Sequence, residues 1–135
     1  MFIIKKIFNS ATNAPDPVKL PTDAASDYRY GTLLILSAGK VKNVEFGQTP
    51  THIAGETVKA GQKTSLLCYE LTPDLLIRTP IEGSPLGLKT GDKLALGFDD
   101  VFADKVINDT EDGVATIADM RGTKKNGDYI YVMFK

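Results

Sequence analysis

Short runs in which apolar and polar residues alternate recur along the chain from Tyr28 onward. The runs are rich in β-branched and aromatic residues, and Gly, Pro, Asn or Asp stands between most of them. This pattern is typical of strands separated by tight turns. No window shows the 3.6-residue apolar period of an amphipathic helix. The pattern predicts eight strands, at residues 32–37, 40–46, 64–71, 75–79, 92–98, 102–108, 114–119 and 128–134.

These strands indicate an all-β fold, a single β-barrel or β-sandwich of about eight short strands. The length of 135 residues is typical of one domain and is sufficient for one real core. We therefore expect residues 28–135 to form a β-barrel or β-sandwich body. Residues 1–27 are expected to form an extended N-terminal arm.

The expected arm has two parts. Residues 2–8 are apolar apart from two lysines and favour a strand, whereas residues 9–27 contain Pro15, Pro17 and Pro21. Proline fixes φ and removes a backbone donor, so the second part is expected to be an extended linker, closing with a helical turn near residues 22–26. Fully extended, a linker of this length spans roughly 60 Å.

A strand of this kind is not stable alone in water, so it must join a sheet of its own body or of a neighbour. The proline-rich linker would let it reach another polypeptide, and strand addition at a sheet edge is a common mode of recognition. The sequence therefore predicts that the arm binds a second copy or another protein. The predicted partner-binding residues are Phe2, Ile4, Ile7 and Phe8.

One short phrase occurs three times, with a Lys two places before a Gly and a Gln or Asp directly after it. The glycines are Gly61, Gly91 and Gly127, and they are too unevenly spaced for a strict repeat architecture. We interpret the phrase as one kind of turn at the same rim of the domain, with Gly supplying a φ that other residues resist. An ancient duplication and a glycine-rich functional loop remain alternatives.

Composition and charge exclude several classes of protein. The chain carries 16 basic and 17 acidic residues without a basic block, so a nucleic-acid partner has no electrostatic support. A single cysteine cannot form an internal disulfide or a cysteine zinc cluster. No stretch approaches the ~18 apolar residues of a membrane helix, and the N-terminus lacks the apolar core of a signal peptide. We expect neither a membrane partner nor secretion by that route.

Two single residues are weak candidates for catalysis. His52 is the only histidine and is expected in a loop, with a structural or surface role. Cys68 lies mid-strand, where a free cysteine usually acts as a small buried apolar residue. A Cys–His pair would need a third orienting group and an oxyanion hole, and nothing in the sequence marks either.

Candidate cation and phosphate sites are equally weak. Residues 108–119 match the calcium-loop template only in part and are expected to lie between strands, whereas the motif needs helices. Asp99, Asp100 and Asp104 could together hold a hard cation, but Asp99 and Asp100 fit a solvated turn after Phe98 better. Residues 83–87 lack the Lys and helix of a phosphate loop. We therefore predict no catalytic residue, no cofactor and no metal site, and we expect that the protein is not an enzyme.

Three stretches together resemble a known class of protein. They are LKTGDKLALGF at 88–98, ADKVINDTEDGVATIADM at 103–120 and NGDYIYVMFK at 126–135. A Gly-Asp strand, a Gly-x-Ala strand and a last C-terminal strand in this order resemble the small β-rich decoration, or cement, proteins of tailed-bacteriophage capsids. The resemblance covers the body from about Gly31 to Lys135, about three quarters of the chain, and the three stretches carry it.

The resemblance implies a structural virion protein that binds and stabilises the outer surface of a phage head. It also implies a major capsid protein as partner, an oligomeric state, synthesis in the host cytoplasm and no catalytic residues. The alternative is a β-sandwich binding module of a virion or cell surface. Such a module would grip carbohydrate or protein through rim loops at residues 47–55 and 83–88.

Overall fold

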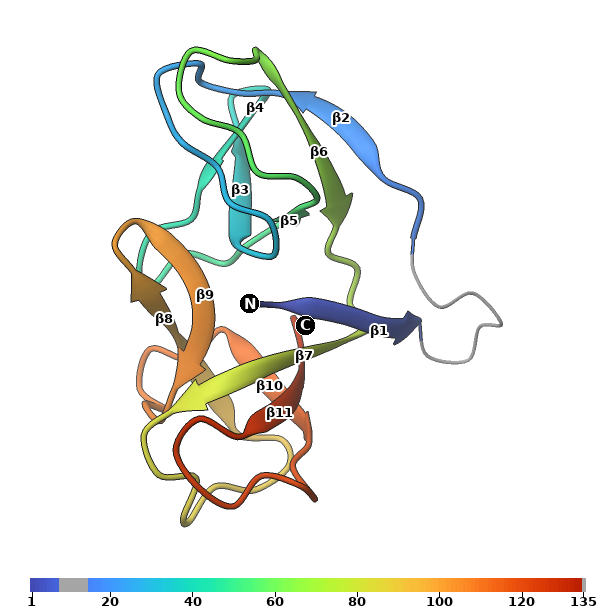
Figure 1. Cartoon of the computed structure of the whole chain (residues 1–135). Helices are drawn as coiled ribbons and strands as arrows, with labels where there is room; N and C mark the ends of the chain where they lie inside the picture. The colour runs from blue at the N-terminus through green and yellow to red at the C-terminus, as the bar shows by residue number, and fades with distance from the viewer. Residues whose placement is uncertain (8–14, 135) are drawn as a thin grey trace.

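The computed structural model describes residues 1–7 and 15–134, which form two connected β-sheets (Figure 1). Within these residues there are eleven strands and no helix. The strands are β1 (Ile3–Ile7), β2 (Val18–Pro21), β3 (Leu33–Ser37), β4 (Lys40–Asn43), β5 (His52–Ala54), β6 (Ser65–Glu70), β7 (Leu75–Glu82), β8 (Lys93–Asp99), β9 (Phe102–Ile107), β10 (Ala115–Asp119) and β11 (Tyr129–Met133).

The first sheet has the order β1-β7-β11-β10-β8-β9 and occupies the lower half of Figure 1. The long strand β7 organises it, because β1 pairs antiparallel with residues 75–78 and β9 pairs parallel with residues 81–82. The return of β9 to β7 closes the strands from β7 to β11 into a small barrel, and β1 extends it. Closure removes the open edges through which sheets aggregate.

The second sheet has the order β2-β6-β5-β3-β4, with antiparallel neighbours throughout. A parallel bridge between Thr22 and Val41 joins the end of β2 to β4, so this sheet also curls toward closure. The all-β prediction is confirmed, but a single barrel or sandwich of eight strands is not what the chain forms. The strands divide instead between two curled sheets.

A shared core holds the two sheets together. In β7 buried and partly exposed residues alternate, which directs Leu75, Ile77 and Ile81 inward. The same cluster of buried side chains includes Leu33 and Ile53 from the second sheet. A smaller cluster inside the second sheet consists of Tyr28, Leu34, Val41, Ala54, Val58, Leu66 and Cys68. Because the larger core draws side chains from both sheets, the chain packs as one body.

The start of the chain belongs to this body, which corrects the prediction of a separate arm. Phe2 is only 2% exposed, and its ring centroid lies 6.0 Å from that of Phe134. Ile4 packs against the same core, and the backbone N–H of Phe2 donates to the carbonyl of Gly31 at 2.8 Å. The physical reason is that the start of β7 offers this strand a pairing edge in its own chain, so no partner is needed to bury it.

The other predicted arm residues have different outcomes. Ile7 lies in β1 opposite Leu75, so its backbone also belongs to the first sheet. Phe8 lies outside the residues that the structure describes. Phe2 and Ile4 are therefore core residues of this chain, whereas the role predicted for Phe8 stays a prediction.

The expected linker contains a strand that the sequence did not predict. β2 pairs with β6 and adds an edge to the second sheet, with Pro21 at its end, where a missing donor is tolerated. Of its residues only Leu20 packs against the core, so the apolar signal was too weak to recognise. A turn at residues 23–26 follows, close to the predicted helical turn. Residue 28 is thus not a boundary between an arm and a body.

The eight predicted strands all exist, with shifted ends. β4 ends at Asn43, earlier than predicted, and β7 continues to Glu82 through Pro80. β5 was missed because three residues are too short to show an alternating pattern.

All three copies of the repeated phrase form the same type of turn. In the first copy Gly61 has φ +82°, the backbone N–H of Gln62 donates to the carbonyl of Lys59, and the Gln62 side chain accepts from the Lys59 N–H at 3.0 Å. Asp92 and Asp128 close the second and third copies in the same way, on Lys89 and Lys125. The turn interpretation is confirmed.

The expectation that the three turns lie at the same rim of the domain is not confirmed. Gly91 and Gly127 precede strands of the first sheet, whereas Gly61 precedes β6 of the second. The three turns therefore serve two sheets, because the turn chemistry is local and does not depend on where the following strand lies.

Candidate functional site

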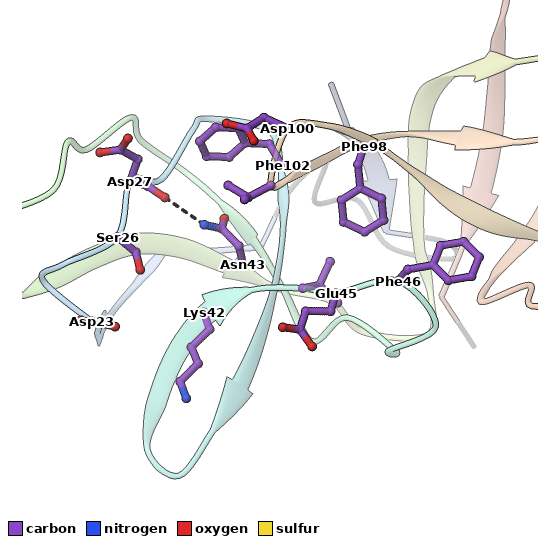
Figure 2. A pocket seen from close by; sticks show the side chains of 12 residues that line it. Asp23, Ser26, Asp27, Lys42, Asn43, Glu45, Phe46, Phe98, Asp100 and Phe102 are labelled. Atoms are coloured by element: carbon purple, nitrogen blue, oxygen red, sulfur yellow. Dashed lines mark hydrogen bonds between the residues drawn. The ribbon is translucent and has the colours of Figure 1, made fainter.

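A cleft of about 600 Å³ opens where the two sheets meet (Figure 2). Three segments that are distant in sequence line it: the turn at residues 23–27, residues 42–46 at and after the end of β4, and residues 98–102 of the β8–β9 hairpin. The first two belong to the second sheet and the third to the first sheet. Packing of the two sheets therefore creates the cleft.

The β8–β9 hairpin supplies one wall. Its turn places Asp100 at φ +57°, a left-handed conformation that Asp tolerates better than most residues. Val101 follows at the tip, 54% exposed, and Phe102 turns back into the protein and is 8% exposed. The hairpin thus presents a carboxylate and an apolar side chain together at the mouth of the cleft.

The second wall holds an exposed aromatic ring on a defined turn. Gln48 closes the turn that begins at Glu45: its side chain accepts from the Glu45 N–H at 2.8 Å, and Gly47 has φ +82°. This is the same turn as in the three predicted copies, with Glu in place of Lys. It fixes the backbone of Phe46, whose ring is 52% exposed.

The third wall is tied to the second by a hydrogen bond. The Asn43 side-chain amide donates to the carbonyl of Asp27 at 2.9 Å, which Figure 2 shows as a dashed line. The Asp27 carboxylate accepts from the N–H of Ala60 at 2.7 Å, and Asp23 accepts from the N–H of Ala25 at 3.0 Å. The Asn43 Oδ1 is buried and accepts no hydrogen bond from the described residues. Beside the cleft there is thus one acceptor that lacks a donor among the described residues and that is closed off from a molecule in the cleft.

The lining is acidic. Four of the twelve lining residues, Asp23, Asp27, Glu45 and Asp100, carry a carboxylate, and one, Lys42, carries an ammonium group. None of these five forms an ion pair within the part of the chain that the structure describes. The arrangement can attract a cation and offer it several acceptors.

Beside the cleft, the chain already binds a cationic side chain of its own. The Arg29 guanidinium lies over the Phe102 ring, 4.2 Å from its centroid, and pairs with Asp99 at 2.8 Å. The hydrogen bond from Arg29 lowers the pKa of the Asp99 carboxyl below its usual value. An aromatic face and a carboxylate of the same hairpin thus hold one guanidinium together.

His52 lies in β5 and is 6% exposed, which corrects its predicted position in a loop. Its Nδ1 is 2.8 Å from the Thr51 hydroxyl, and burial lowers the pKa of the imidazole. Cys68 is fully buried in β6, as predicted, and burial raises its thiol pKa to about 11. In the sheet His52 is opposite Glu70 and Cys68 is opposite Ala54, so the two side chains are not paired with each other.

The predicted polar turns lie where the sequence placed them. Residues 108–114 connect β9 to β10, so strands flank the calcium-like stretch, and its last carboxylate, Asp119, pairs with Arg121. Asp99 is the last residue of β8 and Asp100 lies in the turn that follows it, whereas Asp104 belongs to β9. Among residues 1–7 and 15–134, no group of three His, Cys, Asp or Glu side chains could hold a metal ion, and no helix could cross a membrane.

The two rim loops expected for a binding module differ from each other. Residues 47–55 contain the buried strand β5 and do not form a simple loop. Residues 83–88 do form a loop, in which Pro85 is buried and Leu86 is 90% exposed. The sequence did not predict the cleft, although Glu45 to Gln48 repeats the turn phrase without its Lys, and that similarity could have marked Phe46 as exposed.

Comparison with known proteins gives one informative result. No protein-family model matches the sequence, and no curated protein sequence matches it significantly. Among solved structures, the N base of the head fiber protein gp8.5 of bacteriophage phi29 is similar, with a TM-score of 0.54 at 15% identity. The match covers 89% of this chain and 93% of that one. The two chains share a fold. The similarity extends over nearly the whole of both, so both sheets take part in it.

Proposed function

We propose that this protein is a structural component of a tailed-phage virion, a decoration or cement protein that binds the outer surface of the head. The observation that carries the proposal is the similarity in fold to the phi29 head fiber base over 89% of the chain. The sequence resemblance to capsid decoration proteins in residues 88–135 supports the same class from different evidence.

The candidate residues for catalysis support a role in binding rather than in chemistry. His52 and Cys68 are both buried in strands of the second sheet. At neutral pH a thiol with a pKa of about 11 is protonated and therefore a poor nucleophile. On this proposal the protein is not an enzyme and needs no cofactor.

The proposed partner is the major capsid protein of the same phage, with other copies of this chain as neighbours on the shell. Several large apolar side chains are exposed outside the core and are available for such a contact. They are Leu86, Val101, Phe46 and Tyr129, at 90%, 54%, 52% and 52% exposure. Since Phe2 and Ile4 are core residues, these exposed side chains are better candidates for contact with the shell.

The test is binding to heads of the phage that encodes the chain. Purified protein is mixed with heads lacking it, the heads are sedimented, and the bound copies per head are counted; cryo-electron microscopy then locates the density. Saturable binding with density on the outer surface is expected. Heads that bind no more of this protein than of an unrelated β-protein of similar charge, or density confined to the tail, would contradict the proposal.

A further inference from the structure

We propose that the outer face of the first sheet docks on a partner protein, and that Arg78 in this face binds an acidic side chain of that partner. Buried and more exposed residues alternate in β7, so Leu75 and Ile77 point into the core and Arg78 points away from it. The register puts residues of β1 and β11 on the same side. Besides Arg78, the outer face consists of Ile3, Leu76, Pro80, Tyr129 and Tyr131, each at least partly exposed.

These residues form one contiguous surface. Ile3 and Tyr131 lie opposite Arg78, one on each side of it, and Tyr129 lies opposite Pro80 in the next row of the sheet. Opposite side chains on one face of a sheet are close enough to interact. The face of a sheet that is turned to water usually carries polar side chains, whereas this one surrounds a single charge with apolar and aromatic side chains. Tyr and Arg are also enriched at protein interfaces. The composition is therefore that of a docking surface.

Arg78 is held in position but has no acceptor. Its guanidinium lies over the Tyr129 ring, 4.4 Å from the centroid. Within residues 1–7 and 15–134 it forms no ion pair, and its buried Nε donates no hydrogen bond. The same row of the sheet contains a carboxylate, that of Asp119 opposite Tyr131, but Asp119 pairs with Arg121 at 2.7 Å. A ring against its flat side leaves the edge of a guanidinium free, so the two terminal nitrogens can still bind a carboxylate together.

A second arginine of the chain shows which group Arg78 lacks. Arg29 lies over the Phe102 ring, 4.2 Å from its centroid, and pairs with the Asp99 carboxylate at 2.8 Å. Arg78 has the ring without the carboxylate, so charge complementarity selects an acidic side chain of the partner.

The partner is a different protein rather than a second copy of this chain. Two copies that met at this face across a twofold axis would bring their Arg78 side chains together, and like charges in an apolar contact repel. The inference rests on the proposed function for the partner's identity, because the shell protein would then supply the acidic side chain. The chemistry of the contact follows from the face alone.

The experiment is a titration followed by amide chemical shifts in the ¹⁵N-labelled full chain. The probes are the peptide acetyl-Leu-Glu-Leu amide, which combines a carboxylate with apolar neighbours, and acetyl-Leu-Gln-Leu amide, which has nearly the same shape without the charge. We expect saturable shifts from the glutamate peptide around residues 76–79 and 129–133, and no saturable shift from the glutamine peptide.

Three results would overturn the proposal. They are equal binding of the two peptides, no saturable shift from the glutamate peptide, and shifts scattered over the surface. A dilution series without peptide tests the other occupant: shifts of the same amides that depend on protein concentration would mean that a second copy covers the face, which also contradicts the proposal.

Two variants of one charge change locate the contact. Arg78→Met keeps an unbranched apolar stem and removes the guanidinium, and it should raise the Kd of the glutamate peptide by at least about tenfold, the loss expected for a charge-assisted hydrogen bond. Arg29→Met is the matched control, because Arg29 also lies over a ring but already has its carboxylate, and it should leave the Kd unchanged. An equal loss in both variants, or an unchanged Kd in Arg78→Met with a normal spectrum, would refute the assignment.

The stability of the free protein distinguishes a role in binding from a role in folding. A buried donor without an acceptor costs free energy, so Arg78→Met should melt at the same temperature as the wild type or higher. A clearly lower Tm in Arg78→Met would show that Arg78 serves the fold, and would contradict the proposal.

Head binding separates this inference from the proposed function. We expect Arg78→Met to bind phage heads at least about tenfold more weakly than the wild type and Arg29→Met to bind them as the wild type does. If Arg78→Met no longer binds the glutamate peptide but still binds heads normally, the inferred link between this face and the shell fails and the proposed function stands. If the wild type binds the glutamate peptide on this face but does not bind heads, the proposed function fails and the chemistry of the contact stands.

Discussion

The burial of Phe2 allows a sharp test of whether the start of the chain is part of the core. Phe2→Ala removes a ring that is 98% buried against Phe134 and neighbours in the larger cluster. Burial of a Phe side chain contributes about 1.5–3 kcal/mol, and the cavity left behind adds to the loss. Since the backbone of Phe2 stays hydrogen-bonded to Gly31, the surroundings cannot simply collapse into the space. We expect a loss of about 3–5 kcal/mol of unfolding free energy.

The measurement is urea denaturation of the full chain, followed by circular dichroism and fitted at equal slope. In thermal melts the same loss should lower Tm by roughly 10–20 °C for a domain of this size. Val18→Ala is the control, because Val18 lies in edge strand β2 and is 42% exposed. Its cost should stay within about 0.5 kcal/mol, as for most surface substitutions.

Two results would refute the reasoning. A cost for Phe2→Ala as small as that of the control would mean that the segment is an arm outside the core. A Tm that rises with protein concentration in the wild type but not in a chain lacking residues 1–7 would mean that a neighbouring chain supplies the strand that pairs with β7, because mass action makes the stability of such an assembly depend on concentration.

Three further predictions concern residues in the strands and turns. Cys68→Ser should lower the unfolding free energy measured in urea by about 1–3 kcal/mol, because a buried hydroxyl there needs a hydrogen-bond partner. The thiol of Cys68 in the folded wild type should resist thiol reagents at pH 8, and rapid labelling would contradict its burial. The pKa of His52 is lower in the folded chain than in the unfolded chain, so the unfolded chain binds a proton at a higher pH than the folded chain does. The His52 contribution to the unfolding free energy should therefore be constant above the unfolded pKa of about 6.5 and should fall as the pH decreases below it. His52→Gln should remove that part of the slope, and an identical pH profile in the variant would exclude this cause. Gly91→Ala places a Cβ on a residue with φ +96° and should lower the unfolding free energy by about 1–2 kcal/mol. Gly122→Ala is the control and should be nearly neutral, because Gly122 has open space around it and no positive φ. Equal thermal melts of the two variants would show that the turn at Gly91 tolerates a Cβ.

The sequence predicts the longer strands because their burial alternates along the chain. β6 and β7 are examples: buried and partly exposed residues follow one another, and polar turns lie before and after them. β2 and β5 could not be found, since one is mostly exposed and the other has only three residues. The division into two sheets could not be predicted either, because a periodic pattern shows which residues face inward but not which strands pair.

The candidate site was not predictable for a related reason. Asp27, Glu45 and Asp100 are far apart in the sequence, and each looks like an ordinary solvated residue near a turn. Only the packing of the two sheets brings them to one cleft. For the N-terminal segment the apolar residues correctly indicate burial, but the prolines after it suggest an extended linker that could carry the segment to a partner. The segment pairs instead with β7 of its own chain, which lies about 70 residues away in sequence.

The place of β1 also bears on how the protein acquires its fold during synthesis. β1 is translated well before its pairing strand β7, and even longer before Phe134, against which Phe2 packs. The larger core therefore cannot close until Phe134 has been translated. Until then an apolar strand stays exposed, and contacts of such long sequence separation form slowly. The second sheet, whose strands all lie within residues 18–70, can assemble earlier, and its Leu33 and Ile53 then wait for the first sheet to complete the shared core.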